Sequence, residues 1–310
     1  MTDIKRFDAR MKDRNAVFKE IASVCSAKAG EPMAPHTSFR VGGPADIFAE
    51  PENTEQLSAV LAIVKREGIP FVTIGNGTNL LVRDEGYRGA VIKIAKGFSA
   101  SSIKGLTVKA GAGMTLAALA RRAAEASIGG FEELSGIPGT VGGAVRMNAG
   151  AYGVSVSDLL KSVTYLLDGQ VITKDAAFAE LSYRHSIFCE MKDAVILEAV
   201  FEGKEIRKKE DIIAACEGYN ERRRSSQPLE YFSAGSTFKR PKEGYASKLI
   251  DECGLKGFKV GGAEVSEKHA GFVINKGEAT AEDILAVMEK VRETVLEKKG
   301  ILLEPEVVIL

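Results

Sequence analysis

The chain has 310 residues, of which 45% are hydrophobic and 27% are charged, and its 42 Lys and Arg balance its 42 Asp and Glu. These values are typical of a globular protein of about two domains, and the balanced charge argues against nucleic acid or an anionic membrane as the main partner. No apolar run approaches the roughly 18 residues of a membrane span, and residues 1–15 lack the apolar core of a signal peptide. We therefore expect a cytoplasmic protein, and nothing in the sequence indicates an obligate protein partner.

The first half of the chain is predicted to contain short strands and three helices. Apolar residues at helical spacing, followed by a segment rich in Gly and Pro, predict a helical lead-in over residues 1–30. Asn53 and Thr54 can cap a helix that runs to about Lys65. Strands are predicted at 45–49, 70–74, 91–94 and 106–110, and an alanine-rich helix at 116–126.

The second half begins with a predicted hairpin at 159–172 around Asp168 and Gly169, followed by a strand at 195–201. A charged helix at 205–224 is expected to join the first two hundred residues to the rest, and its apolar stripe is Ile206, Ile212, Ile213 and Cys216. Further predictions are a helix at 246–254, a strand at 270–275, a helix at 280–298 capped by Thr280 and ended by Gly300, and a closing strand at 303–310. Because strands and helices follow no regular βαβ order, we expect an α+β fold.

The most unusual segment is 135–150, which holds five glycines, one proline and two alanines and has neither a helical nor a strand period. Glycine lets another molecule approach the backbone closely. The segment is almost uncharged, which favours backbone laid against a flat or anionic ligand over an ordinary loop between packed elements.

Two further glycine-containing segments, 75–79 (GNGTN) and 38–46 (SFRVGGPAD), precede this run. The first follows a predicted strand, and its successive N–H groups can form a nest for an anion such as a diphosphate, although a plain turn would use the same residues. It matches neither the Walker A nor the Rossmann pattern. We expect the loops near positions 75 and 140 to lie together around one cofactor.

The segments 38–46, 75–81 and 135–150 and four later ones together resemble the UDP-N-acetylenolpyruvoylglucosamine reductase family. The later segments are 183–186 (YRHS), 234–239 (AGSTFK), 261–266 (GGAEVS) and 303–307 (LEPEV). The resemblance spans nearly the whole chain from about residue 30, and seven motifs in the right order are very specific. It implies non-covalent FAD, NADPH as electron donor, and an FAD-binding module of the vanillyl-alcohol-oxidase (PCMH) type. Its two subdomains would occupy 1–92 and 93–203, followed by a C-terminal α+β substrate-binding domain at 204–310.

The resemblance also implies a reaction. FAD takes hydride from NADPH, and its N5 atom passes hydride to the methylene carbon of UDP-N-acetylglucosamine enolpyruvate, giving UDP-N-acetylmuramate for peptidoglycan precursors. The cofactor-binding residues that it implies are Arg40, Gly75, Asn76, Gly77, Thr78, Asn79, Leu80, Ser135, Gly136, Ile137, Pro138, Gly139, Thr140, Gly142 and Gly143. Some relatives carry an extra tyrosine loop after the Tyr-Arg segment, and this chain resembles the shorter type without it.

The implied catalytic residues are Arg184, Ser236 and Glu306. A guanidinium suits the substrate carboxylate and the charge that develops next to it, whereas a surface arginine in an ion pair is the alternative. Ser236 is the implied proton donor, unless it only bonds its own backbone in a turn. Glu304 and Glu306 share one face of an extended strand, so spacing alone cannot choose between them. The family pattern selects Glu306.

The implied substrate-binding residues are Tyr183, Arg224, Lys239, Arg240 and Lys248. At position 240 the chain has Arg where many relatives carry an Asn that is associated with the diphosphate. Four scattered cysteines and three distant histidines show neither a disulfide framework nor a metal-binding pattern. Two other functions stay open: a flavin oxidase on the same fold, which would share the glycine loops and use oxygen, and a non-catalytic sugar-nucleotide sensor, which would be colourless. The oxidase would leave the AGSTFK and LEPEV segments unexplained.

Overall fold

The computed structural model describes residues 14–310, which form two compact units that alternate along the chain. The first unit holds the described residues up to 31 together with 45–75 and 88–217, and the second holds 32–44, 76–87 and 218–310. The predicted boundaries near 92 and 203 would give contiguous domains, and that three-part division stays a prediction.

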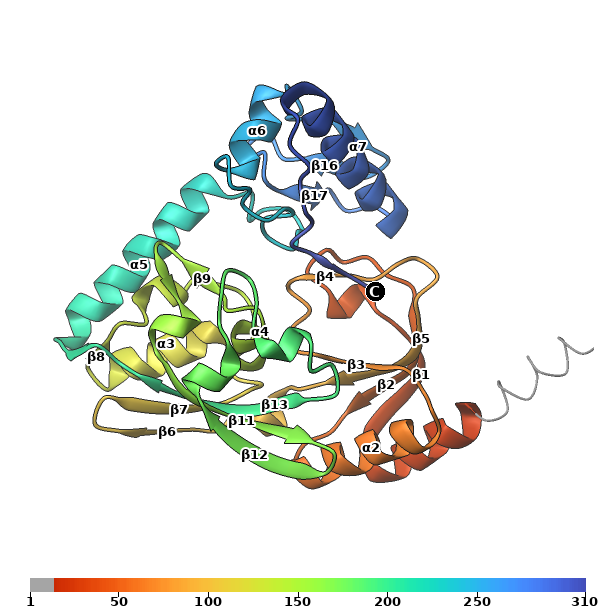
Figure 1. The fold of residues 1–310 in the computed structure, drawn as a ribbon, viewed down its shortest axis with the longest axis vertical. Coiled ribbons are helices and arrows are strands. Elements are labelled where there is room, and N and C mark those ends of the chain that lie inside the picture. Colours follow the sequence, from red (N-terminus) through yellow and green to blue (C-terminus); the bar gives the residue numbers. More distant parts are fainter. Residues whose placement is uncertain (1–13) are drawn as a thin grey trace, which may run out of the picture. The chain divides into compact units, whose positions relative to one another are not determined.

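The first unit contains two main sheets (Figure 1). In the four-stranded sheet, of order β1-β2-β5-β3, strands β3 and β5 are parallel. Its strands are β1 (Ser26–Pro32), β2 (Pro44–Glu50), β5 (Tyr87–Lys93) and β3 (Phe71–Ile74). The five-stranded sheet, of order β12-β11-β13-β7-β6, is antiparallel throughout. Its strands are β12 (Gln170–Asp175), β11 (Leu160–Leu167), β13 (Val195–Glu202), β7 (Thr107–Gly111) and β6 (Ser101–Lys104).

Helices α2 (Thr54–Arg66), α3 (Leu116–Glu125) and α4 (Val141–Arg146) also belong to this unit, in addition to the helical residues 14–24. The helix α2 buries Leu57, Val60 and Leu61 on one face, and the Asn53 side chain accepts a hydrogen bond from the Gln56 amide at its start. The helix α3 is followed by the short helix α4, which packs on β13 and β7. Short two-stranded pairs join β9 (Gly150–Ala151) to β10 (Val154–Ser155) and β14 (Glu205–Ile206) to β8 (Ile128–Gly129).

The second unit has its own apolar core, formed mainly by one face of the helix α7 (Ala281–Lys299) against a small antiparallel sheet. That sheet consists of β15 (Lys259–Val260), β16 (Ala263–Val265) and β17 (Val273–Asn275), and α6 (Ala246–Glu252) contacts α7. A parallel pair joins β4 (Leu80–Leu81) to β18 (Val308–Ile309). The helix α5 (Lys209–Ser226) runs from the first unit into the second, as expected of the predicted joint.

Most predicted elements are confirmed, and the failures are local. Residues 14–24 are helical, but the predicted helix does not extend to residue 30, because 26–32 form the edge strand β1; residues 1–13 of that prediction lie outside the described part. Residues 205–206 form β14, so Ile206 is 66% exposed and does not belong to the apolar stripe of the charged helix. The closing strand, predicted at 303–310, comprises only residues 308–309. Strand β6 and the short pairs were not predicted.

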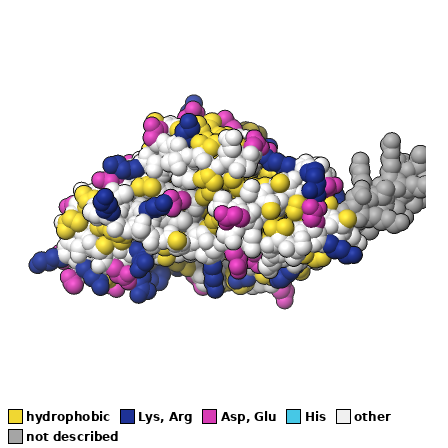
Figure 2. All heavy atoms as spheres, turned by 90° about the horizontal axis from the view of Figure 1, so that it is seen from below, with side chains coloured by type: hydrophobic (Ala, Val, Ile, Leu, Met, Phe, Trp, Pro, Cys, Tyr) yellow, Lys and Arg dark blue, Asp and Glu magenta, His cyan; other side chains and the backbone are white. Residues whose placement is uncertain are grey.

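Acidic and basic residues are equal in number in the sequence, with 42 of each. Figure 2 shows basic and acidic side chains intermixed over the face that it draws, in agreement with a formal net charge of zero. No helix among residues 14–310 is long and apolar enough to cross a membrane. The four cysteines are free, and burial raises the pKa of the Cys25 and Cys216 thiols.

Candidate functional site

In the first unit, Gly75 at the end of β3 meets Thr140 of the glycine-rich run. A Cβ atom added to Gly75 would lie 2.2 Å from Thr140 Oγ1, so a side chain at position 75 is sterically excluded. Thr140 is 3% exposed, and its hydroxyl oxygen accepts a hydrogen bond from the Gly143 amide at 3.4 Å. The expectation that the chain near 75 lies beside the chain near 140 is therefore confirmed.

The glycine-rich segment 135–150 contains more regular structure than its sequence indicates. Residues 141–146 form α4, which the absence of a helical period did not predict. The Val141 amide donates to the Met114 carbonyl at 2.7 Å, and the Gly142 amide donates to the Ala112 carbonyl at 2.9 Å. Gly142 also lies where a Cβ would be 2.9 Å from the Ala112 Cβ. Two of the glycine-run amides thus hold α4 against the chain after β7, and the glycines serve close packing as well as a ligand.

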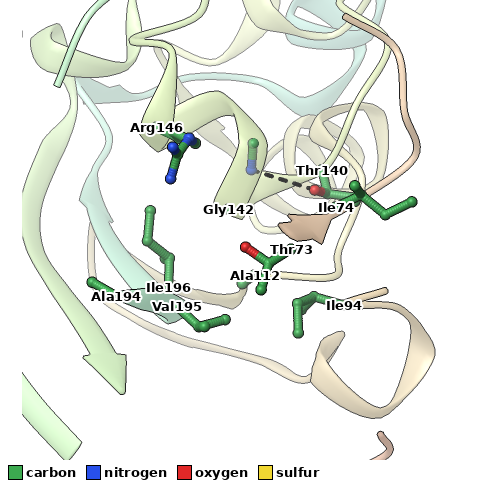
Figure 3. A pocket seen from close by; sticks show the side chains of 12 residues that line it. Thr73, Ile74, Ile94, Ala112, Thr140, Gly142, Arg146, Ala194, Val195 and Ile196 are labelled. Carbon is green, nitrogen blue, oxygen red and sulfur yellow. Dashed lines mark hydrogen bonds between the residues drawn. The ribbon is translucent and has the colours of Figure 1, made fainter. Parts of the chain in front are cut away.

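A pocket with about 400 Å³ of empty volume, part of it open solvent, lies at this junction (Figure 3). Its walls come from the end of β3, the start of β13, the segment after β7, and α4. The lining residues are Thr73, Ile74, Gly75, Ile94, Ala112, Thr140, Gly142, Gly143, Arg146, Ala194, Val195 and Ile196. Four of them, Gly75, Thr140, Gly142 and Gly143, were predicted to bind the cofactor. Arg146 was missed although it lies within the glycine-rich run, and the apolar residues that open β13 carry no sequence signal.

The chemistry of the pocket fits an anionic dinucleotide with a planar ring. Aliphatic side chains and glycine backbone form most of the wall, and among the described residues that line it only Arg146 is charged. Apolar walls with a few convergent polar groups are typical of cofactor sites. Gly75 contributes only backbone to this wall, because the space where its Cβ would stand is occupied by the Thr140 side chain. FAD has both the flat ring and the negative charge that such a wall accommodates.

The turn that carries Arg184 is attached to the chain just after α4. The Asn148 side chain donates from Nδ2 to the Ser182 carbonyl at 2.9 Å, and its Oδ1 accepts from the Ser157 amide at 3.0 Å. Asn148 is 7% exposed and has a φ of 41°, a left-handed conformation that Asn tolerates better than most residues. Asn148 was not predicted as a site residue.

Further contacts fix the same turn. The Ser186 hydroxyl, fully buried, donates to the Arg146 carbonyl at 2.6 Å. Arg184 itself has a φ of 54°, donates from Nη2 to the Gly150 carbonyl at 3.4 Å, and places its guanidinium 5.3 Å from the centre of the Tyr183 ring. Tyr183 is 54% exposed. Arg184 and Tyr183 thus sit on a turn held by the segment that also lines the pocket.

In the second unit, the predicted loop after β3 contacts the upstream 38–46 segment. The Ser38 amide donates to the Gly77 carbonyl at 3.1 Å, and a Cβ added to Gly77 would lie 2.0 Å from the His36 carbonyl oxygen. Gly77 has a φ of 63°. Arg40, with a φ of 58°, donates to the Pro35 carbonyl at 3.2 Å and lies 5.8 Å from the centre of the Phe232 ring. The segment that begins at Ser38 and the loop that contains Gly77, both of which contribute to the family resemblance, therefore pack against each other.

The segment with the paired glutamates lies between the loop at 79 and the strand-like segment at 237–239. The Glu306 amide donates to the Thr237 carbonyl at 2.8 Å, and Asn79 Nδ2 donates to the Glu306 carbonyl at 3.0 Å. Glu304 has an exposed side chain that pairs with Lys239 Nζ at 3.3 Å, whereas Glu306 is half-buried. The two carboxylates that spacing could not separate thus have different surroundings.

Ser236 precedes this anchored segment and is exposed. Its hydroxyl makes no hydrogen bond to any of residues 14–310, so the turn-serine alternative, in which it bonds its own backbone, does not describe it. Gly235 before it has a φ of 80°. The amide of Thr237, the next residue, donates to the Gly271 carbonyl at 2.8 Å.

The other predicted substrate residues lie on the second unit with these neighbours. Arg224 pairs with Glu221 at 2.6 Å on α5, and Lys248 lies 3.8 Å from Glu252 on α6. The Arg240 guanidinium stacks 4.1 Å from the centre of the Tyr245 ring. Arg184 belongs to the first unit and Ser236 and Glu306 to the second, so a single site that unites the three residues stays a prediction.

Comparison with known proteins agrees with this geometry. Residues 45–174 match the family model described as FAD binding domain, and residues 227–310 match the model described as UDP-N-acetylenolpyruvoylglucosamine reductase, C-terminal domain. The chain is 49% identical over 290 residues to the UDP-N-acetylenolpyruvoylglucosamine reductase of Agathobacter rectalis, covering 89% of this chain and 91% of the relative. It is 45% identical over 301 residues to that of Lachnoclostridium phytofermentans, covering 94% and 96%.

A solved structure extends the agreement to three dimensions. The crystal structure of UDP-N-acetylenolpyruvylglucosamine reductase from Thermus caldophilus is 34% identical, covers 92% of this chain and 98% of its own, and superposes with a TM-score of 0.78. The predicted fold class is thereby confirmed: an α+β protein with an FAD-binding module and a distinct C-terminal domain. The chain belongs to the UDP-N-acetylenolpyruvoylglucosamine reductase family and is an FAD-containing oxidoreductase.

Proposed function

We propose that this protein catalyses the NADPH-dependent reduction of UDP-N-acetylglucosamine enolpyruvate to UDP-N-acetylmuramate. The observation that carries the proposal is the attachment of the Arg184 turn to the pocket segment through Asn148 and Ser186. An enol ether that accepts hydride must lie against the cofactor ring and present its carboxylate to a cation. A guanidinium fixed from the cofactor-lining segment meets both needs at once.

FAD, when bound non-covalently, supplies hydride exchange between the nicotinamide and the substrate. Arg184 binds the substrate carboxylate in a bidentate manner and stabilises the negative charge that develops on the adjacent carbon. Ser236 gives a proton to that carbon, and Glu306 stabilises the enolate-like charge. The exposed, unbonded hydroxyl of Ser236 and the half-buried position of Glu306 support these roles.

Recognition of the uridine diphosphate is assigned to Arg224, Lys239, Arg240 and Lys248, with Tyr183 contacting the sugar or its ether. Each of these cations has a partner in the structure, a carboxylate or an aromatic ring. All of these partners are surface contacts, which an anionic ligand replaces at little cost. The cytoplasmic location predicted from the sequence accords with this substrate.

Two half-reactions test the proposal. The yellow holoenzyme is reduced anaerobically with NADPH, with NADH as the comparison, and the flavin absorbance is followed while UDP-N-acetylglucosamine enolpyruvate is added. Reduction by NADPH followed by reoxidation with formation of UDP-N-acetylmuramate is the expected result. Reoxidation by oxygen alone would indicate an oxidase, and a colourless protein that binds the sugar nucleotide would indicate a sensor.

A further inference from the structure

The pocket of the first unit contains a cation that no proposed step uses. Arg146 is the last residue of α4, and its side chain points toward Ile196, which lines the same pocket (Figure 3). Its backbone is held in place, because its carbonyl oxygen accepts hydrogen bonds from Ser186 Oγ at 2.6 Å and from Cys189 Sγ at 3.2 Å. The guanidinium therefore extends from a fixed point.

No negatively charged group among the described residues balances the positive charge of the Arg146 guanidinium. No carboxylate within residues 14–310 forms an ion pair or a hydrogen bond with its guanidinium. The other residues of the pocket wall are aliphatic, glycine or threonine, so none carries a negative charge. A half-buried guanidinium loses part of its hydration, and that loss is offset only when an anion or strong acceptors reach it. The neutral wall thus surrounds a site of positive potential that an anionic group of a ligand would fill.

We propose that Arg146 binds an anionic group of FAD in this pocket. The planar fork of the guanidinium matches two oxygens of a diphosphate, and it equally matches the negatively charged edge of the reduced flavin ring. Both are anionic groups of the same cofactor. The two sources differ in what they stabilise: a diphosphate contact strengthens FAD binding in both redox states, whereas a ring contact favours the reduced state alone.

The test uses the full chain, freed of flavin and reconstituted. The variant Arg146→Gln is compared with Arg146→Lys and with the control Arg121→Gln on α3, whose side chain is 81% exposed and pairs with Glu125 at 3.0 Å. FAD affinity is measured by quenching of flavin fluorescence, ADP affinity by displacement of FAD, and the midpoint potential by spectroscopic titration. Melting temperatures of the flavin-free proteins check that each variant folds.

A diphosphate contact predicts that Arg146→Gln binds FAD and ADP about 10- to 100-fold more weakly, with Arg146→Lys in between. A ring contact predicts unchanged binding of oxidised FAD and a more negative midpoint potential in Arg146→Gln, partly restored in Arg146→Lys. Either result supports the proposal, and it does so whatever substrate the enzyme reduces. It is overturned if Arg146→Gln behaves like Arg121→Gln in both measurements. It is also overturned if Arg146→Lys loses as much as Arg146→Gln, because charge would then not be what the site requires.

Discussion

Asn79 donates a hydrogen bond from Nδ2 to the backbone carbonyl of Glu306 at 3.0 Å, although 227 residues separate them in sequence. The bond joins a residue of the predicted cofactor loop to the predicted acid of the reaction within one compact unit. Backbone pairing between β4 and β18, in which Leu80 lies opposite Val308, continues the same connection. The loop that contains Asn79 and the closing segment that contains Glu306 thus form one structural element. A substitution in one of them should therefore alter the position of the other.

The first prediction concerns this bond. Asn79→Ala removes the donor and leaves the Glu306 carbonyl with one partner fewer, so the free energy of unfolding should fall by about 1 kcal/mol. If Glu306 acts in the reaction, kcat should fall more than KM rises. Asn53→Ala is the matched control, because it also removes an Asn-to-backbone bond, at the start of α2. If Asn79→Ala had the same kcat and KM as Asn53→Ala, the hydrogen bond from Asn79 to Glu306 would have no role in the reaction.

Much of the fold follows from local sequence rules. The capped helix α7 was predicted nearly to the residue, because Thr280 and Asp283 form a capping box and Gly300 ends the helix with a φ of 69°. The hairpin of β11 and β12 was predicted for the same kind of reason, since Asp168 and Gly169 both have the positive φ that its turn requires. These signals reside within a few residues and do not depend on the rest of the chain.

The sequence predictions fail where contacts between distant residues determine the local structure. The glycine-rich run contains α4 because Thr140 caps it and the Val141 and Gly142 amides bond to the segment after β7, which no local pattern reveals. Asn148 was not predicted as a site residue for the same reason, because its hydrogen-bond partners Ser157 and Ser182 lie 9 and 34 residues away. The resemblance implies which residues react, whereas the structure shows which side chains bond to the turn that carries Arg184.

The second prediction concerns Ser236. In Ser236→Ala the flavin should be reduced by NADPH at nearly the wild-type rate, whereas reduction of the enolpyruvyl substrate should slow about 100-fold or more, as expected when a general acid is lost. Stopped-flow absorbance measures the two steps separately. Ser225→Ala serves as control, since Ser225 is exposed on α5 and bonds only the Arg222 carbonyl there. Wild-type turnover of the substrate by Ser236→Ala would remove the serine from the mechanism.

The third prediction concerns the meeting point of the two glycine loops. Gly75→Ala places a Cβ where it collides with the Thr140 side chain, so Thr140, which caps α4, must move and FAD affinity should drop at least about tenfold. Gly218→Ala is the control, because a Cβ at Gly218 on α5 meets no atom within 4 Å and Ala favours a helix. The double variant Gly75→Ala/Thr140→Ala should recover part of the affinity. Equal FAD binding by Gly75→Ala and the wild type would show that the contact is not strained.

The fourth prediction concerns the hold on the Arg184 turn. Asn148→Asp keeps the shape but places an oxygen against the Ser182 carbonyl, so kcat/KM for the enolpyruvyl substrate should fall at least about tenfold, with NADPH oxidation by the flavin little affected. Hydrogen exchange of the 182–186 amides should accelerate in the same variant. Asp168→Ala provides a control for a non-glycine residue with positive φ, 48°, in an exposed turn. Unchanged exchange at 182–186 in Asn148→Asp would refute the role.

The last prediction concerns pH and His269. Burial is the main cause that lowers the pKa of His269 below its ordinary value of 6.5, and Lys256 adds to it. In its neutral form, Nδ1 accepts from the Gly271 amide at 3.2 Å, and the ring packs edge-on against Phe272 at 4.9 Å between centres. Protonation removes that acceptor. Gly271 in turn accepts the Thr237 amide, so the segment after Ser236 depends on this neutral histidine.

Because the folded pKa lies below the unfolded one, the unfolded chain binds more protons as the pH falls below about 6.5, and the folded state loses stability there. The loss contributed by His269 is absent at pH 8 and cannot exceed about 1.4 kcal/mol per pH unit for one group. His269→Asn offers a non-titrating oxygen near the position of Nδ1. Urea unfolding at pH 8, 6.5 and 5.5 should therefore show the stability of the wild type falling relative to that of His269→Asn. A constant difference between the two proteins over this range would mean that the histidine titrates alike in both states.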